Sequence, residues 1–90
     1  DVDYILEFWY TMKTTPAGTL TVAVLDGPVT DPASIPSRTI ESVVLNDQTD
    51  ANLYTKGTLE FNSGNSVKVA IYFNNADVES RIDTWSISIK

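Results

Sequence analysis

Apolar and polar residues alternate with a period of two along most of this chain. Between residues 4 and 12 the even positions are apolar and the odd positions are mixed, which is typical of a strand that buries one face. Five more strands are predicted from similar runs at 19–24, 39–45, 53–61, 67–73 and 82–89. No segment shows a convincing helical period, and only the stretch 76–81 suits a single helical turn. The pattern therefore predicts an all-β domain, an antiparallel β-sandwich of about six or seven strands.

Turn-forming residues separate the predicted strands and indicate how they connect. Residues 14–18 contain a proline and a glycine, so the first two strands are expected to form a hairpin. The stretch 62–66, with Gly64 among polar residues, predicts a second hairpin between the fourth and fifth strands. Residues 26–38 hold three of the four prolines and are expected to form a surface loop, because proline cannot donate to a strand ladder.

The alternation also assigns aromatic side chains to faces of the sheets. Trp9 has the opposite parity to the apolar row of its strand and is expected to point outward. An exposed indole ring can stack on a sugar ring, so Trp9 is the first candidate ligand-binding residue. The alternatives are that Trp9 faces a second layer or a neighbouring domain, or simply fills a position that favours β-structure. The other candidates for a shallow sugar platform are the outward residues of the fourth and fifth strands, Tyr54, Lys56, Glu60 and Tyr72.

The inward row of the last predicted strand contains a tryptophan and an aspartate beside its isoleucines. Trp85 shares the phase of Ile87 and Ile89, so it is expected to pack in the core. Asp83 falls in the same inward row. A buried carboxylate is costly unless it is paired or bound to a cation, so Asp83 needs a partner.

Composition narrows the classes of function. The net charge of −6 argues against nucleic acid and anionic membranes as partners. The chain has no histidine, which excludes mechanisms that need an imidazole, and it has no phosphate-binding loop or nucleophile elbow. It has no cysteine and no apolar run of 18 residues, so neither a disulfide nor membrane insertion is expected. We therefore expect a protein that is not an enzyme.

Three segments resemble strands of bacterial jelly-roll modules. They are the run YILEFWY at 4–10, the run VKVAIYF at 67–73 and the run IDTWSI at 82–87. The families are the carbohydrate-binding-module-like domains and the cleaved-adhesin or MAM-like domains of secreted and surface proteins. The resemblance implies a jelly-roll-like sandwich, a secreted or cell-surface location, and a module that binds glycans or mediates surface contacts. In these families about a quarter of the domain precedes the opening strand. The chain, 1–90, is thus expected to be one domain of a longer protein that lacks its first strands.

The resemblance also implies a structural calcium ion. In these families the aspartate that matches Asp83 often helps to hold calcium, and Asp1 and Asp3 are the further candidate ligands. Calcium takes six to eight oxygen ligands, so several loops must converge on it. The alternative is that Asp83 caps a turn or pairs with Arg81 or Arg38 at the sheet edge, without any metal.

Two functions follow as expectations. The first is a non-catalytic carbohydrate-binding module, which binds glycan by aromatic stacking and hydrogen bonds. The alternative is a structural or adhesive module that contacts another protein domain, or a second copy of itself, through its sheet edges.

Overall fold

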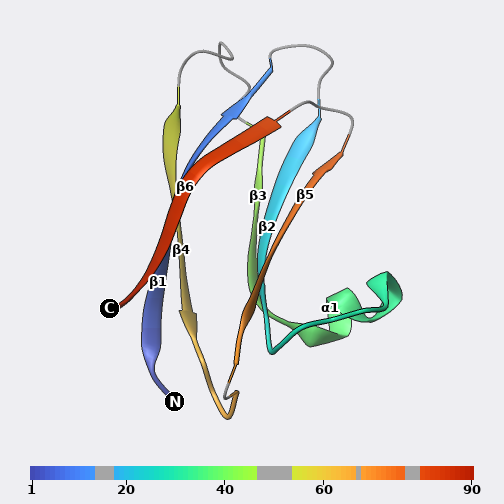
Figure 1. Cartoon of the computed structure of the whole chain (residues 1–90), viewed down its shortest axis with the longest axis vertical. Helices are drawn as coiled ribbons and strands as arrows, with labels where there is room; N and C mark the ends of the chain where they lie inside the picture. Colours follow the sequence, from blue (N-terminus) through green and yellow to red (C-terminus); the bar gives the residue numbers. More distant parts are fainter. Residues whose placement is uncertain (14–17, 47–53, 67, 77–79) are drawn as a thin grey trace.

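The computed structural model describes residues 1–13, 18–46, 54–66, 68–76 and 80–90, and it contains two antiparallel three-stranded sheets (Figure 1). Sheet A has the strand order β4 (Thr55–Asn62), β1 (Asp3–Met12) and β6 (Ser80–Ile89). Sheet B has the order β3 (Thr39–Leu45), β2 (Thr19–Leu25) and β5 (Ala70–Ala76). The predicted all-β sandwich with six strands is confirmed. Within these residues no helix has the length and apolar character needed to cross a bilayer.

Both predicted hairpins are wrong. β1 and β2 belong to different sheets, and so do β4 and β5, so each connection crosses from one sheet to the other (Figure 1). The turn after β4 is present all the same: Gly64 has a φ of 56°, and its N–H donates to Asn62 Oδ1 at 2.7 Å. Turn residues reverse the chain locally, but they do not decide whether the returning strand pairs beside the first or packs over it.

The strand boundaries are close to the predicted ones except in β5. This strand runs from Ala70 to Ala76 and continues through Asn74 and Asn75, where the turn-forming residues had suggested a break. Pairing with β2 explains the extension, because the ladder reaches from Leu25 and Ala70 to Thr19 and Ala76. In the stretch 76–81, where one helical turn was considered, residues 76, 80 and 81 are in strands and 77–79 lie outside the described residues.

The proline-rich segment 26–38 is a surface connection between β2 and β3, as predicted. It contains a short 3₁₀ turn, η1 (Pro32–Ser34), and one turn of helix, α1 (Ile35–Arg38). The Asp31 side chain accepts a hydrogen bond from the N–H of Ala33 at 3.1 Å and so caps η1. Arg38 forms an ion pair with Asp26, which joins the two ends of the segment.

The core lies between the sheets and consists of alternate residues of the central strands. Phe8 is fully buried, and its ring centroid lies 5.7 Å from Tyr10 and 6.2 Å from Phe73 of the other sheet. Gly57 lies opposite Phe8 in β4, and a Cβ atom there would overlap the Phe8 ring. The buried apolar cluster comprises Leu6, Phe8, Tyr10, Met12, Leu20, Val22, Val24, Leu59 and Phe61.

The two edges of sheet A differ in how well they are covered. In β4 the inward residues Leu59 and Phe61 are only 8% and 5% exposed, and β4 lies near β3 of the other sheet. In β6 the corresponding residues are Trp85 and Ile89, which align with core positions of β1 but are 53% and 73% exposed. The sandwich is therefore closed along β4 and open along β6.

Candidate binding site

A β-bulge in β6 shapes the outer face of sheet A. Phe8 pairs with Trp85 and Tyr10 pairs with Ile82, so β6 has one residue more than β1 between these pairs. Residues 83 and 84 both lie opposite Trp9 as a result. A bulge of this kind changes the direction of nearby side chains and the phase of the strand.

Two predictions about β6 are wrong, and the bulge explains the first of them. Asp83 was expected in the inward row, but it is exposed, and its neighbour Ile82 packs against the core instead. Trp85 was expected to be buried in the core, but more than half of its surface is exposed. The extra residue explains the position of Asp83, because one inserted residue exchanges the two faces of the strand between Trp85 and Ile82. Trp85 keeps the inward phase, opposite Phe8, but it lies on an edge strand that, among the described residues, no strand of sheet B covers as β3 covers β4.

The bulge borders a hollow of about 150 Å³ to which all three strands of sheet A contribute. Trp9, which is 43% exposed, lies on the outer face as predicted. Trp85, the second tryptophan of the chain, borders the same hollow. The lining residues are Glu7, Trp9, Lys56, Thr84, Trp85 and Ser86.

Strand register explains how the polar lining residues meet. Lys56 lies directly opposite Trp9, and Glu7 lies opposite Ser86 of β6 on the other side. Lys56 and Glu7 are therefore diagonal neighbours across β1 and β4, and their side chains form an ion pair. Both side chains are partly exposed, so the pair adds little to stability. Its main consequence is that the charges of the hollow compensate each other.

The structure gathers only part of the predicted sugar platform. Tyr54 is 41% exposed and lies just before β4, and it is not among the residues that line the hollow. Tyr72 is partly buried and lies on sheet B opposite Ala23, so it does not share a face with Trp9. Glu60 lies farther along β4 and lines a different pocket. Of the predicted ligand-binding residues, the hollow brings together Trp9 and Lys56.

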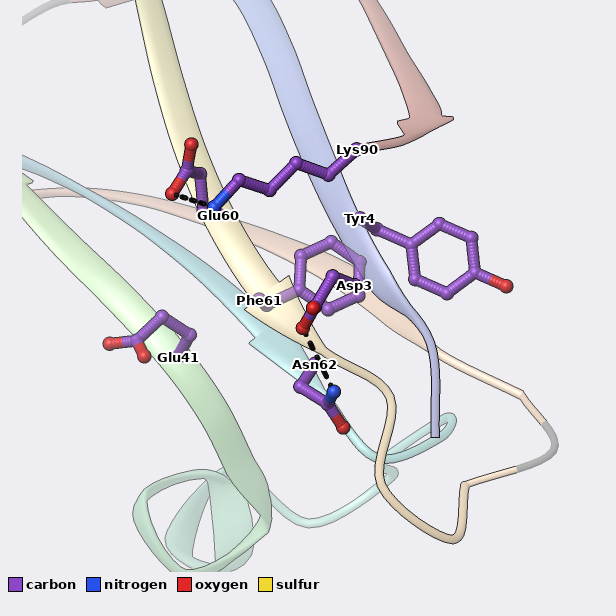
Figure 2. Close-up of a pocket in the computed structure, with 7 residues that line it drawn as sticks. All are labelled: Asp3, Tyr4, Glu41, Glu60, Phe61, Asn62 and Lys90. Carbon is purple, nitrogen blue, oxygen red and sulfur yellow. Dashed lines mark hydrogen bonds and ion pairs between the residues drawn. The ribbon is translucent and has the colours of Figure 1, made fainter.

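The second pocket lies near the start of β1 and has a volume of about 210 Å³ (Figure 2). Four of its polar side chains are bonded to one another in two pairs. Lys90 Nζ donates to Glu60 Oε2 at 3.0 Å, and Asn62 Nδ2 donates to Asp3 Oδ1 at 2.9 Å. The lining residues are Asp3, Tyr4, Glu41, Glu60, Phe61, Asn62 and Lys90. The ion pair and the amide contact make this pocket a bonded polar cluster at the edge of sheet A.

The Lys90–Glu60 contact predicts a specific titration behaviour. The hydrogen bond to Glu60 and the charge of Glu60 raise the pKa of Lys90 above its ordinary value. The pair stabilises the fold fully below the unfolded-state pKa of lysine, about 10.4, and this contribution is lost as pH rises through the raised pKa. Glu60→Gln is expected to lower the pKa of Lys90, as measured by NMR titration of the lysine side chain. Glu41→Gln, in the same pocket, is the control, and an equal shift in both variants would contradict the assignment.

The three candidate calcium ligands are not brought together. Asp3 lies opposite Asn62 at the start of β1, whereas Asp83 lies opposite Trp9, six residues and about 20 Å along the strand. Across the described part of the chain, no group of three or more acidic, histidine or cysteine side chains is placed to hold a metal ion. Of the two arginines considered as partners of Asp83, Arg38 is paired with Asp26 instead.

Glu7 was not predicted to bind a ligand, and neither were the three lining residues of β6, Thr84, Trp85 and Ser86. One signal in the sequence could have found them: apolar residues of the last strand are two apart from 85 to 89, but three apart between Ile82 and Trp85. This break in the alternation is the bulge. Comparison of the chain with protein-family models, curated proteins and solved structures finds no significant match, so the functional argument depends on the geometry of the hollow.

Proposed function

We propose that this protein is a non-catalytic carbohydrate-binding module of a secreted or cell-surface protein, and that the hollow on sheet A holds the glycan. One observation carries the proposal: both tryptophans of the chain border one hollow that is also lined by hydroxyl and charged side chains. Indole rings offer flat apolar faces to the C–H groups of a sugar ring. The hydroxyls of Thr84 and Ser86 offer donors and acceptors for sugar hydroxyls.

The charges of the hollow favour a neutral glycan. Lys56 and Glu7 are paired, so the hollow has no uncompensated charge to attract a uronate or a sulfate group. The whole chain carries a net charge of −6, which also disfavours anionic polysaccharides. A sugar hydroxyl can still bond to either member of the pair, and hydrogen bonds to charged groups are stronger than those between neutral groups.

The lining of the hollow also supports binding without catalysis. Glycosidases use two carboxyl groups that flank the scissile bond. Among the described residues that line the hollow, Glu7 is the single carboxylate, and it is engaged by Lys56. The jelly-roll-like family and the location outside the cell are parts of the proposal that depend on the resemblance of residues 4–10, 67–73 and 82–87 to such modules.

Replacing either tryptophan by alanine is expected to weaken glycan binding. Loss of one stacking contact is worth about 1–1.5 kcal/mol, so Trp9→Ala and Trp85→Ala are each expected to raise Kd about tenfold. A glycan array identifies a ligand, and isothermal titration calorimetry then measures Kd for each variant. Because the chain has two tryptophans and both border the hollow, ligand addition should also change the intrinsic fluorescence.

Val44→Ala is the matched control, since Val44 is 61% exposed on sheet B, away from the hollow. Its Kd should equal that of the wild type. Single-tryptophan variants, Trp9→Phe and Trp85→Phe, assign the fluorescence change to each ring. Unchanged glycan affinity in Trp9→Ala and Trp85→Ala, or an array without any neutral glycan ligand, would contradict the proposal.

A further inference from the structure

The open edge of β6 combines exposed apolar side chains with an unpaired backbone. Within the described ranges this ten-residue strand pairs with β1 alone. By register, Trp85, Ile87 and Ile89 align with the inward residues Phe8, Leu6 and Tyr4. Trp85 and Ile89 are nevertheless 53% and 73% exposed, because no strand of the described part of the chain lies beyond them. A long apolar edge of this kind is a template for pairing with another strand.

The direction of the backbone groups follows from one hydrogen bond. The Lys90 N–H donates to the Asp3 carbonyl at 2.9 Å, so the backbone groups of residue 90 point toward β1. Successive residues of a strand direct their backbone groups to opposite sides. The N–H and C=O groups of residues 85, 87 and 89 therefore point away from β1, toward the unpaired edge. The residues with backbone groups at the unpaired edge are the same ones that form the apolar row, in which Trp85 and Ile89 are exposed and Ile87 is partly buried.

We propose that β6 pairs antiparallel with β6 of a second copy of the chain, about a two-fold axis next to Ile87. The segment Trp85-Ser86-Ile87-Ser88-Ile89 has nearly the same pattern in both directions. Centring the pair on Ile87 places Trp85 opposite the partner's Ile89 and Ser86 opposite the partner's Ser88. Apolar residues then meet apolar residues, and serines meet serines. A strand from a different protein would not require this symmetry about Ile87.

Other registers fit less well. Residues 85, 87 and 89 direct their backbone groups to the free edge, so each must pair with an odd-numbered residue of the partner strand. The alternative registers therefore differ from the proposed one by shifts of two residues. Centring on Ser86 places Asp83 opposite the partner's Ile89, and centring on Trp85 places Asp83 opposite the partner's Ile87. Both require the new ladder to run through the bulge at Asp83, where the phase of the strand changes and regular pairing is interrupted. The register centred on Ile87 avoids this, because its paired segment begins at Thr84, directly after Asp83.

Charge also favours this register. The chain has a net charge of −6, but residues 80–90 carry two cations, Arg81 and Lys90, and one anion, Asp83. β6 therefore does not share the acidic excess of the rest of the chain. In the proposed register Lys90 lies opposite the partner's Thr84, one residue from the partner's Asp83. The Lys90 ammonium group stays bonded to Glu60 of its own chain, so this register places no like charges opposite each other.

The size of the contact sets its strength. Three hydrogen-bonded pairs supply about six backbone hydrogen bonds. The paired segment is short, so the buried area falls below the roughly 1,200 Å² of a stable interface, and we expect a micromolar or weaker dimer. The product is one six-stranded sheet with the strand order β4-β1-β6-β6-β1-β4. The outer-face residues Glu7, Trp9 and Lys56 lie away from the new pairing, whereas Trp85 borders the hollow and also lies in the paired segment.

Sedimentation equilibrium of the whole chain over 10 µM to 1 mM tests the dimer, and Ile89→Lys tests the edge. Ile89 is mostly exposed, so the variant should keep the far-UV spectrum of the wild type, while the dimer dissociation constant should rise at least tenfold. Val44→Lys makes the same change at an exposed position of sheet B and should leave the constant within twofold. A monomer throughout this range, or equal effects of the two variants, would overturn the proposal.

A cysteine variant tests the register. The chain has no cysteine, so Ile87→Cys forms a disulfide only between two copies. Opposed residues of a hydrogen-bonded pair are about 5.5 Å apart at Cα, which suits a disulfide. Ile87→Cys is expected to give a covalent dimer under mild oxidation, at least tenfold faster than Val44→Cys. A dimer that cross-links no faster through residue 87 than through residue 44 would refute pairing of β6 about Ile87.

Discussion

Replacing Gly57 by alanine is expected to destabilise the fold by about 2–3 kcal/mol, the upper part of the range for overpacked cores. The new methyl group would overlap the ring of Phe8, which is fully buried and held between Tyr10 and Phe73. The total free energy of unfolding of a domain of this size is about 5–13 kcal/mol, so this loss is a large fraction of it. Urea unfolding followed by circular dichroism measures the change.

A second substitution tests the cause of that loss. Phe8→Leu makes room at the contact. The loss of stability in the double variant Phe8→Leu/Gly57→Ala should therefore be clearly smaller than the sum of the losses in the two single variants. Gly64→Ala is the control. No atom lies near its Cβ position, and its cost of about 1–2 kcal/mol comes from the φ of 56°, so it should add to Phe8→Leu without coupling. Simple additivity of Gly57→Ala and Phe8→Leu would show that the ring contact is not the cause.

Deleting one residue is expected to have opposite results in β6 and in β4. Without Asp83, Thr84 alone lies opposite Trp9, and Ile82 and Trp85 keep their pairing with Tyr10 and Phe8. The deletion variant should therefore fold, with a midpoint temperature within a few degrees of the wild type. Deleting Thr58 from β4, which has no bulge, exchanges the faces of the strand on one side and should prevent folding.

Circular dichroism and thermal unfolding of the two deletion variants measure this difference. The test is sensitive to the bulge because both deletions remove one exposed polar residue from an edge strand of the same sheet. Equal loss of structure in the two variants would contradict the bulge and, with it, the placement of Thr84 and Trp85 beside Trp9.

The faces of individual strands were predictable because alternation is a local property. The outward position of Trp9 and the buried row that contains Phe8 follow from the parity of β1 alone. Asp83 was placed wrongly because parity was extended across an irregular strand, whereas Trp85 has the predicted phase but is exposed on an edge strand. The spacing of three between Ile82 and Trp85 marked the irregularity, but it acquires meaning only when β1 is known to be the pairing partner.

The partners of the strands were not predictable from the turns. Residues 62–66 form a turn, as expected, but the chain then enters the other sheet. For the same reason Tyr72 is on the sheet opposite Trp9, although both have the outward parity of their strands. A turn sequence specifies a few backbone angles, whereas the choice of sheet depends on the burial of whole faces against each other.

The sequence by itself determined that this chain forms strands, which side chains of a regular strand share a face, and that Trp9 points away from the core. Each of these properties follows from neighbours along the chain. The tertiary structure alone decided which strands share a sheet, that Trp85 joins Trp9 at one hollow, and that β6 is left uncovered. These properties depend on contacts between residues far apart in sequence, where one extra residue in a strand changes which side chains meet.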